Sequence, residues 1–311
     1  MNVLSYAALL CYNSLVFMVA GGIGNMILFH SMTHAIIYIV LTVALLIAYG
    51  TRKNPLNTGG RFVQELFSSR VFLFHFVAMI AILFFNKLEL SIESRMNVAS
   101  DFTPHIFAYE GLFVHHLQRI FEHDLLTTIL AYFYVVVFPS LLIASIGIYT
   151  YERNYTMFYA VCYALMINYL VAIPFYLYFP VNEVWAYAPA HVQFLAAKSF
   201  PSFESEYRPM SGLNNCFPSL HTSISVTLAV LAYHSRNKAW SIFVGISAAI
   251  IIFSIFYLGI HWLTDMSGGI VLGLFAALTA VRIAERRPLF GGFSDLQRRL
   301  REKKVKVAGE R

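Results

Sequence analysis

The stretch SIFVGISAAIIIFSIFYLGIHWLTD, residues 241–265, joins a long apolar run to a short polar motif. Its first part, 241–260, contains no Asp, Glu, Lys or Arg. A run of about 20 apolar residues is long enough to cross a bilayer as an α-helix. The stretch therefore predicts a membrane-spanning helix that ends at a polar site.

The rest of the chain repeats this pattern. Of its 311 residues, 59% are hydrophobic and only 12% are charged, whereas about 25% of the residues of a soluble domain are charged. We therefore predict an all-α fold, a polytopic bundle of transmembrane helices. About eight spans are expected, at 7–29, 33–50, 71–87, 125–149, 155–178, 218–235, 239–260 and 264–284.

Basic residues orient these spans. All but five of the 22 Lys and Arg residues fall on the side that holds the C-terminal tail, and such loops stay in the cytoplasm. We expect an integral protein of the cell membrane with both termini cytoplasmic. The polar motif at 261–265, and a second one at 214–223, would lie on the outer face. The net charge of +6 then reflects membrane topology, and no nucleic-acid-binding surface is indicated. The five exceptions are Lys87, Arg95, Arg119, Lys198 and Arg208.

Two segments outside the spans are informative. In the outer loop 88–124, apolar side chains recur every four residues, which predicts an amphipathic helix at the membrane surface; they are Tyr109, Phe113, Leu117 and Phe121. The tail at 286–311 is basic and suits contact with anionic headgroups. We divide the chain into N-terminal spans with the surface helix (1–124), a catalytic membrane core (125–285) and the cytoplasmic tail (286–311).

The cysteines and histidines give no metal-binding pattern. Cys11, Cys162 and Cys216 form no CxxC or Cys/His spacing, so disulfides and structural zinc are not expected. The start of the chain lacks the pattern of a cleaved signal peptide. We expect the first helix to act as the targeting signal.

A second polar motif, NNCFPSLHTS at 214–223, lies where another predicted span begins. Pro218 suits the first turn of a helix, because it has no N–H to leave unsatisfied there. Free backbone N–H groups of that turn, with the Ser219 hydroxyl, would form an anion site. His221 lies beside it as an acid or base.

The motif HWLTD supplies a complementary pair. His261 and Asp265 are four residues apart and would share one face of a helix. The carboxylate can hold one imidazole nitrogen and leave the other free as a base or nucleophile. Because the topology brings both motifs to the outer ends of neighbouring spans, and ionisable groups there are costly, we predict one shared site.

Together, CFPSLHTS and YLGIHWLTD resemble the second and third signature motifs of the type 2 phosphatidic acid phosphatase superfamily, the lipid phosphate phosphatases and phosphotransferases. The resemblance covers about residues 155–284 and is closest to the inositol phosphorylceramide synthase branch. It implies that His261 attacks phosphorus to form a phosphohistidine, that Asp265 orients it, and that His221 protonates the leaving group. Ser219 and adjacent backbone would hold phosphate oxygens, and no metal or other cofactor is implied.

The chain departs from the superfamily pattern in its cations. The third motif there begins with Ser-Arg, but Ser254 is followed here by Ile255. A phosphoryl group in transfer still needs positive charge. The outer-face candidates for phosphate binding are Arg208 and Lys198, although they are too widely spaced for the first motif.

The segment YFPVNEVWAY, residues 178–187, more plausibly takes the place of the first motif. It supplies Asn182 and Glu183, which we consider candidate headgroup ligands. The reduced number of cations suits a phosphodiester.

These residues predict a membrane enzyme acting on a phosphorylated lipid. Water as the acceptor makes it a phosphatase, whereas a polyol or lipid hydroxyl makes it a headgroup phosphotransferase, and the sequence leaves both open. A non-catalytic lipid-binding relative is a further alternative, because the motif arginine is missing. A transporter would place charges or broken helices near the midplane, and no Asp, Glu, Lys or Arg lies deep in a predicted span.

Overall fold

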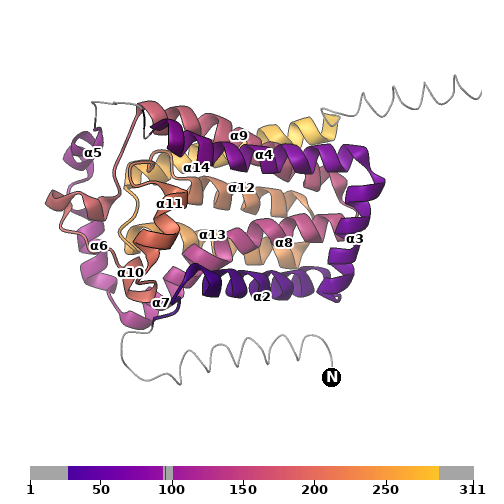
Figure 1. The fold of residues 1–311 in the computed structure, drawn as a ribbon, viewed down its shortest axis with the longest axis horizontal. Coiled ribbons are helices and arrows are strands. Elements are labelled where there is room, and N and C mark those ends of the chain that lie inside the picture. Colours follow the sequence, from indigo (N-terminus) through magenta and orange to yellow (C-terminus); the bar gives the residue numbers. More distant parts are fainter. Residues whose placement is uncertain (1–26, 94, 96–100, 287–311) are drawn as a thin grey trace, which may run out of the picture.

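Long helices lie side by side and a cap of short helices and loops covers one end of the bundle (Figure 1). The computed structural model describes residues 27–93, 95 and 101–286. These residues form no β-strand, only one isolated bridge between Val181 and Asn215. The all-α prediction is confirmed. The long helices are α2 (Met32–Thr51), α4 (Arg70–Glu93), α7 (Asp124–Tyr132) continuing through the π-helical residues Phe133–Val137 into α8 (Phe138–Tyr151), α9 (Tyr155–Tyr178), α12 (Leu220–His234), α13 (Lys238–Tyr257) and α14 (Leu263–Arg286).

Within the described residues, six helical segments are long and apolar enough to cross a membrane: α2, α4 up to Ile92, α7–α8, α9, α13 and α14. Each matches a predicted span, and α4 is longer than the predicted 71–87. The predicted span 218–235 is the shorter helix α12, of 15 residues. The predicted span 7–29 lies, apart from its last three residues, outside the described part of the chain.

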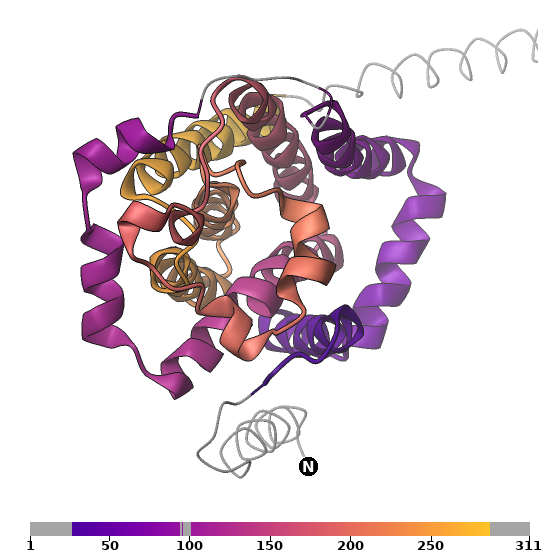
Figure 2. The same ribbon diagram turned by 60° about the vertical axis from the view of Figure 1, so that its left-hand side comes forward.

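Helix α12 lies at the centre and packs against α8, α9, α13 and α14 (Figure 2). Small residues let α14 approach it closely. A Cβ atom on Gly269 would lie 2.6 Å from the Ser219 carbonyl oxygen, and one on Gly273 would lie 2.4 Å from that of Ser223. Gly269 and Gly273 thus allow close packing that fixes the start of α12 against α14.

Three turns at the end of the bundle opposite the cap have the same sequence pattern, an arginine followed by an asparagine. Arg52, Arg153 and Arg236 each adopt a left-handed conformation after a helix, and an asparagine then caps the next helix. Asn154 is the N-cap of α9 and Asn237 is the N-cap of α13, and the side chain of each accepts a hydrogen bond from a first-turn N–H. Asn54 does the same for α3 (Pro55–Ser68), a helix within the predicted loop 51–70. Asparagine is among the best N-caps because its short side chain reaches these N–H groups.

The cap differs from the predicted surface helix. Two helices, α5 (Thr103–Glu110) and α6 (Phe113–Phe121), replace one, because Gly111 adopts a positive φ of 57° between them. Phe113 and Phe121 contact Phe256 and Phe253 of α13, but Tyr109 is 93% exposed. Only part of the predicted stripe therefore packs on the bundle.

Candidate active site

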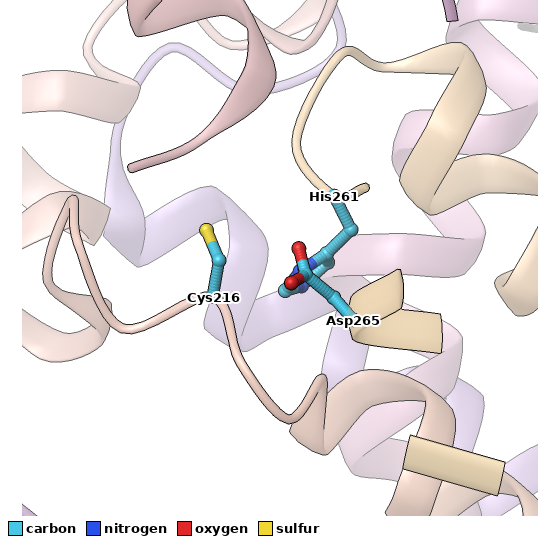
Figure 3. Close-up of side chains that lie close together, drawn as sticks. All are labelled: Cys216, His261 and Asp265. Atoms are coloured by element: carbon cyan, nitrogen blue, oxygen red, sulfur yellow. The ribbon is translucent and has the colours of Figure 1, made fainter. Parts of the chain in front are cut away.

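His261 and Asp265 pair at the junction of α13 and α14, as predicted. Asp265 Oδ2 lies 3.3 Å from His261 Nδ1 and accepts the Trp262 N–H at 2.8 Å (Figure 3). Since a carboxylate accepts, Nδ1 donates and Nε2 keeps its lone pair. Both side chains are buried.

The expectation that one helix holds both residues is wrong. Helix α14 begins at Leu263, so His261 precedes it. Asp265 lies in the first turn and folds its carboxylate back over the helix N-terminus. It reaches His261 because negative side chains are favoured at that end of a helix.

Ser219 joins the two motifs. It is the N-cap of α12, and its hydroxyl accepts a hydrogen bond from the Thr222 N–H at 3.3 Å. Its own N–H donates to the Asp265 carbonyl oxygen at 3.1 Å. Pro218 was predicted in the first helical turn, but it lies before the cap because Ser219 provides the better N-cap side chain.

His221, in the first turn of α12, faces His261. Their ring centroids are 6.3 Å apart. The ring of Tyr134 stacks on His221 at 4.1 Å and that of Phe138 lies at 4.4 Å. The Nε2 atom of His221 is buried and has no hydrogen-bond partner among the described residues. This nitrogen is therefore available to a ligand.

A cavity of about 300 Å³ connects the two histidines. Its walls are largely aromatic and aliphatic and include Tyr134, Phe138, Tyr176 and Leu220, while Glu183, Asn215 and Cys216 add polar groups. This size and mixture of apolar walls with a few polar groups is typical of ligand sites. We call it the catalytic cavity.

The segment proposed in place of the first motif lies between the other two. Val181 N–H donates to the Asn214 carbonyl oxygen at 2.9 Å, and Val184 N–H donates to that of Ile260 at 3.2 Å. The Trp262 indole N–H donates to the Asn182 carbonyl oxygen at 2.9 Å. Backbone hydrogen bonds thus connect all three segments.

The structure does not bring the two candidate cations to the histidines. Arg208 donates to both oxygens of Glu183, at 2.5 and 2.7 Å, and to Glu204 and the Gly212 carbonyl oxygen. Lys198 pairs with Glu122 at 2.7 Å. No Lys or Arg of the described residues lines the catalytic cavity.

Asn182 and Glu183 also differ in position. The Asn182 amide donates to Asp101 and Thr103, away from the cavity. Glu183 lines the cavity and is buried. Burial raises the pKa of the Glu183 carboxyl, and the hydrogen bonds and charge of Arg208 oppose that effect. The buried Glu183 carboxyl is therefore paired with the Arg208 guanidinium.

The backbone of α12 can supply positive potential to the cavity. Leu220 and His221 line it from the first turn of α12, where N–H groups have no partner within the helix. The helix dipole adds to their effect. The first turn of α12, where the sequence predicts an anion cradle, thus borders the cavity, although Ser219 itself is not part of the cavity wall.

Cys216 lies with the catalytic pair. The potential ligand atoms of Cys216, His261 and Asp265 are within 4.8 Å of one another (Figure 3). The sequence spacing gave no such indication, because Cys216 belongs to the other motif. A soft divalent ion could bind this set, but only by competing with the bond between His261 and Asp265.

Sequence reasoning missed Glu110 in the cap. Its two carboxylate oxygens accept the N–H groups of Leu263 at 2.6 Å and Thr264 at 2.5 Å. They therefore cap the helix that carries Asp265. A glutamate at the end of an amphipathic pattern offers no signal for this role. Tyr134, under His221, was likewise indistinguishable from other aromatic residues of its span.

Comparisons with known proteins support the resemblance. A family model described as the PAP2 superfamily matches residues 108–279, more than half of the chain. The Escherichia coli (strain K12) protein named "Putative undecaprenyl-diphosphatase YbjG" is 37% identical over 68 residues, which is 22% of this chain and 34% of that protein. The chain thus matches about a third of that protein's length. No solved structure matches.

Proposed function

Because the chain belongs to the PAP2 superfamily, we propose that it is a membrane enzyme that cleaves or transfers the phosphoryl group of a phosphorylated lipid. One observation carries the proposal: the His261–Asp265 pair and His221 face each other across the catalytic cavity. Similarity to a protein named as an undecaprenyl-diphosphatase supports a lipid phosphatase.

In the first step, His261 Nε2 attacks phosphorus and the bond from phosphorus to the leaving oxygen breaks. Asp265 accepts the Nδ1–H hydrogen bond and stabilises the positive charge that develops on the ring. His221, from the opposite side, gives a proton to the leaving oxygen. The first-turn N–H groups of α12 stabilise the charge on the phosphoryl oxygens.

In the second step, a hydroxyl group attacks the phosphohistidine. His221, now neutral, removes the proton of that hydroxyl as its oxygen bonds to phosphorus, and the bond to His261 breaks. Water gives free phosphate, and a polyol or lipid hydroxyl gives a new phosphodiester or phosphomonoester. The protein groups return to their starting states, and no step needs a metal ion.

We further infer that the site opens to the outer face. The turns that follow α2, α8 and α12 lie at the end of the bundle opposite the cap (Figure 1), and each contains an arginine, namely Arg52, Arg153 and Arg236. Basic loops stay in the cytoplasm, so this end would be cytoplasmic and the catalytic cavity would lie toward the outside. Measuring which end is labelled by a membrane-impermeant reagent on single introduced cysteines tests this orientation.

A headgroup transferase of the inositol phosphorylceramide synthase type is the second candidate. The absence of Lys and Arg from the described cavity wall favours it, because a phosphodiester carries less charge than a phosphate monoester. The side-chain carbonyl oxygen of Asn215, in that wall, has no hydrogen-bond partner among the described residues and is available to accept a hydrogen bond from a polyol hydroxyl.

The experiment uses the purified full chain in detergent with EDTA. Lipid phosphates, diphosphates and phosphodiesters are offered with and without polyol and lipid acceptors, to the wild type and to His261→Ala and His221→Ala. His234→Ala, at the far end of α12, is the matched control. Free phosphate that is lost in both site variants identifies a metal-independent phosphatase, whereas headgroup transfer without free phosphate identifies a transferase. Full activity in His261→Ala would exclude the phosphohistidine. A site that binds lipids but turns none over would identify the non-catalytic relative.

A further inference from the structure

A second cavity, of about 320 Å³, lies among α2, α3, α4 and α8. Its walls come from four helices, with Ile47 on α2, Phe62 on α3, Met79 on α4 and Ile143 on α8. All lining residues except Thr58 are apolar. Such a wall offers nothing to a charged headgroup, since an unpaired charge there is costly, but it suits a hydrocarbon chain.

The arrangement of the helices creates this space. Helix α2 packs on α8 and α4 packs on α9, while α3 connects α2 and α4 at the end opposite the cap (Figure 2). Because α2 and α4 pack on different helices, they leave a space between them, over α8. The second cavity is thus in the apolar part of the bundle.

The second cavity begins one helical turn from the catalytic cavity. On α8, Pro139 lines the catalytic cavity and Leu142 and Ile143 line the second one. From Tyr134, which stacks on His221, the helix continues to Gly147 at the far wall. At a rise of about 1.5 Å per residue this is about 20 Å. Helix α3 also forms part of the far wall, so this wall lies toward the end of the bundle opposite the cap.

We propose that the second cavity holds the hydrocarbon tail of the lipid whose phosphate occupies the catalytic cavity. This inference rests on the proposed function for the identity of the headgroup. A lipid lying parallel to the helices places its headgroup at one end of the bundle and its tail toward the other, which matches the order of the two cavities. The substrate class is therefore a lipid phosphate with a long tail, since a short chain ends before the second cavity.

Two neighbouring glycines of α3 provide a matched test. Gly59 and Gly60 are both exposed, and a Cβ atom on either would meet nothing within 4 Å, but only Gly59 lines the second cavity. Gly59→Phe fills the cavity, whereas Gly60→Phe makes the same change of residue in the same helix outside it. The probes are dioctanoyl and dioleoyl phosphatidic acid, which share a headgroup.

We expect Gly59→Phe to lower kcat/KM for the dioleoyl lipid about tenfold, the effect of losing roughly two buried methylene groups. Activity on the dioctanoyl lipid should stay within about twofold, a difference too small to represent even one such group. Gly60→Phe should leave both activities at the wild-type level. Equal losses for the two lipids, or equal effects of the two substitutions, would overturn the tail site.

A binding measurement separates this inference from the proposed function. A long-chain lipid phosphate with a diazirine at the end of its tail is photolysed with the full-length wild type and His261→Ala, and the labelled peptides are identified. Labelling of α3, α4 and α8 around the second cavity, reduced in Gly59→Phe and not in Gly60→Phe, supports the tail site even if neither phosphatidic acid is turned over. Labelling that is unchanged in Gly59→Phe, or confined to other helices, would overturn it.

Discussion

Glu110 accepts the backbone N–H of Leu263 at 2.6 Å across a separation of 153 residues in the sequence. Its other oxygen accepts the N–H of Thr264 at 2.5 Å. The cap is thereby bonded to the first turn of α14, the turn that presents Asp265 to His261. Carboxylates stabilise helix N-termini. This contact therefore fixes the start of α14, which lies between His261 and Asp265 in the chain.

Glu110→Ala should lower activity more than it lowers substrate binding. Hydrogen bonds to a charged group contribute about 1.5–3 kcal/mol, and a small displacement of a catalytic group costs up to about 100-fold in rate. We expect kcat to fall about tenfold or more with KM nearly unchanged, and Glu110→Gln to recover part of the loss. Glu122→Ala, which removes the exposed cap pair with Lys198, is the control. The same loss of kcat in both variants would contradict a specific role for Glu110.

Asp265→Asn should keep the fold and lose most of the activity. An amide can still accept the Trp262 N–H, but it cannot stabilise a positive charge on His261. Removing the orienting carboxylate from such a pair lowers kcat by about 10⁴-fold in a serine protease, and we expect roughly 10²–10⁴-fold here. Thermal unfolding in detergent and transfer of radiolabelled phosphate from substrate to protein are measured together. Normal phosphoryl-enzyme formation in this variant would mean that Asp265 does not orient the nucleophile.

Arg208→Gln should destabilise the protein and make its stability depend on pH. Removing one partner of a buried ion pair costs about 3–5 kcal/mol, because Glu183 is left charged and buried. Burial already raises the pKa of the Glu183 carboxyl, and loss of Arg208 raises it further. With a raised pKa in the folded state, the Glu183 carboxyl loses its proton in the unfolded state first, as the pH rises above about 4.3. Raising the pH therefore favours the unfolded state. The deficit relative to wild type should therefore be largest near neutral pH and shrink toward pH about 4.

The double variant Glu183→Gln with Arg208→Gln tests the role of this pair. Because it removes both charges, we expect it to recover much of the thermal stability. If it also recovers activity, the pair has a structural role. If stability returns without activity, Arg208 or Glu183 contributes to substrate binding, as the sequence predicted for both.

Gly269→Ala should push apart α12 and α14, the helices that carry the two halves of the site. The new Cβ atom would lie 2.6 Å from the Ser219 carbonyl oxygen, and overpacking of this kind costs about 1–3 kcal/mol. We expect a lower unfolding temperature and lower kcat, since α12 carries His221 and α14 carries Asp265. Gly245→Ala on α13, where a Cβ atom meets nothing within 4 Å, should instead stabilise the helix by up to about 1 kcal/mol. Equal stabilisation by both substitutions would contradict the close contact.

Local patterns in the sequence were sufficient to predict the long helices and the proximity of the three candidate catalytic residues. Apolar runs of about span length become helices because backbone groups in a bilayer must be satisfied internally. The motif residues His221, His261 and Asp265 lie together because each follows or precedes such a run. Gly269 and Gly273, four residues apart on one face of α14, make its close contact with α12.

The ends of elements were less predictable, because they depend on capping. Pro218 seemed suited to a first turn, but Ser219 takes the cap and places the proline outside. His261 and Asp265 seemed to share a helix, yet α14 begins between them. The surface helix at 88–124 is divided at Gly111, whose backbone conformation ends α5.

By itself, the sequence determined the all-helical membrane fold and the proximity of the two motifs that hold the candidate catalytic residues, because these follow from hydropathy and local spacing. Only the tertiary structure decided which charges are available to a substrate. The sequence gives no distant partner for Arg208 or Lys198, but folding brings Glu183 to Arg208 and Glu122 to Lys198. Glu110 reaches the catalytic helix in the same way. Glu183 and Arg208 are 25 residues apart in the chain, and Glu122 and Lys198 are 76 apart. Local spacing therefore gives no sign of either pair, and a buried charge such as that of Glu183 is stable only where packing supplies its partner.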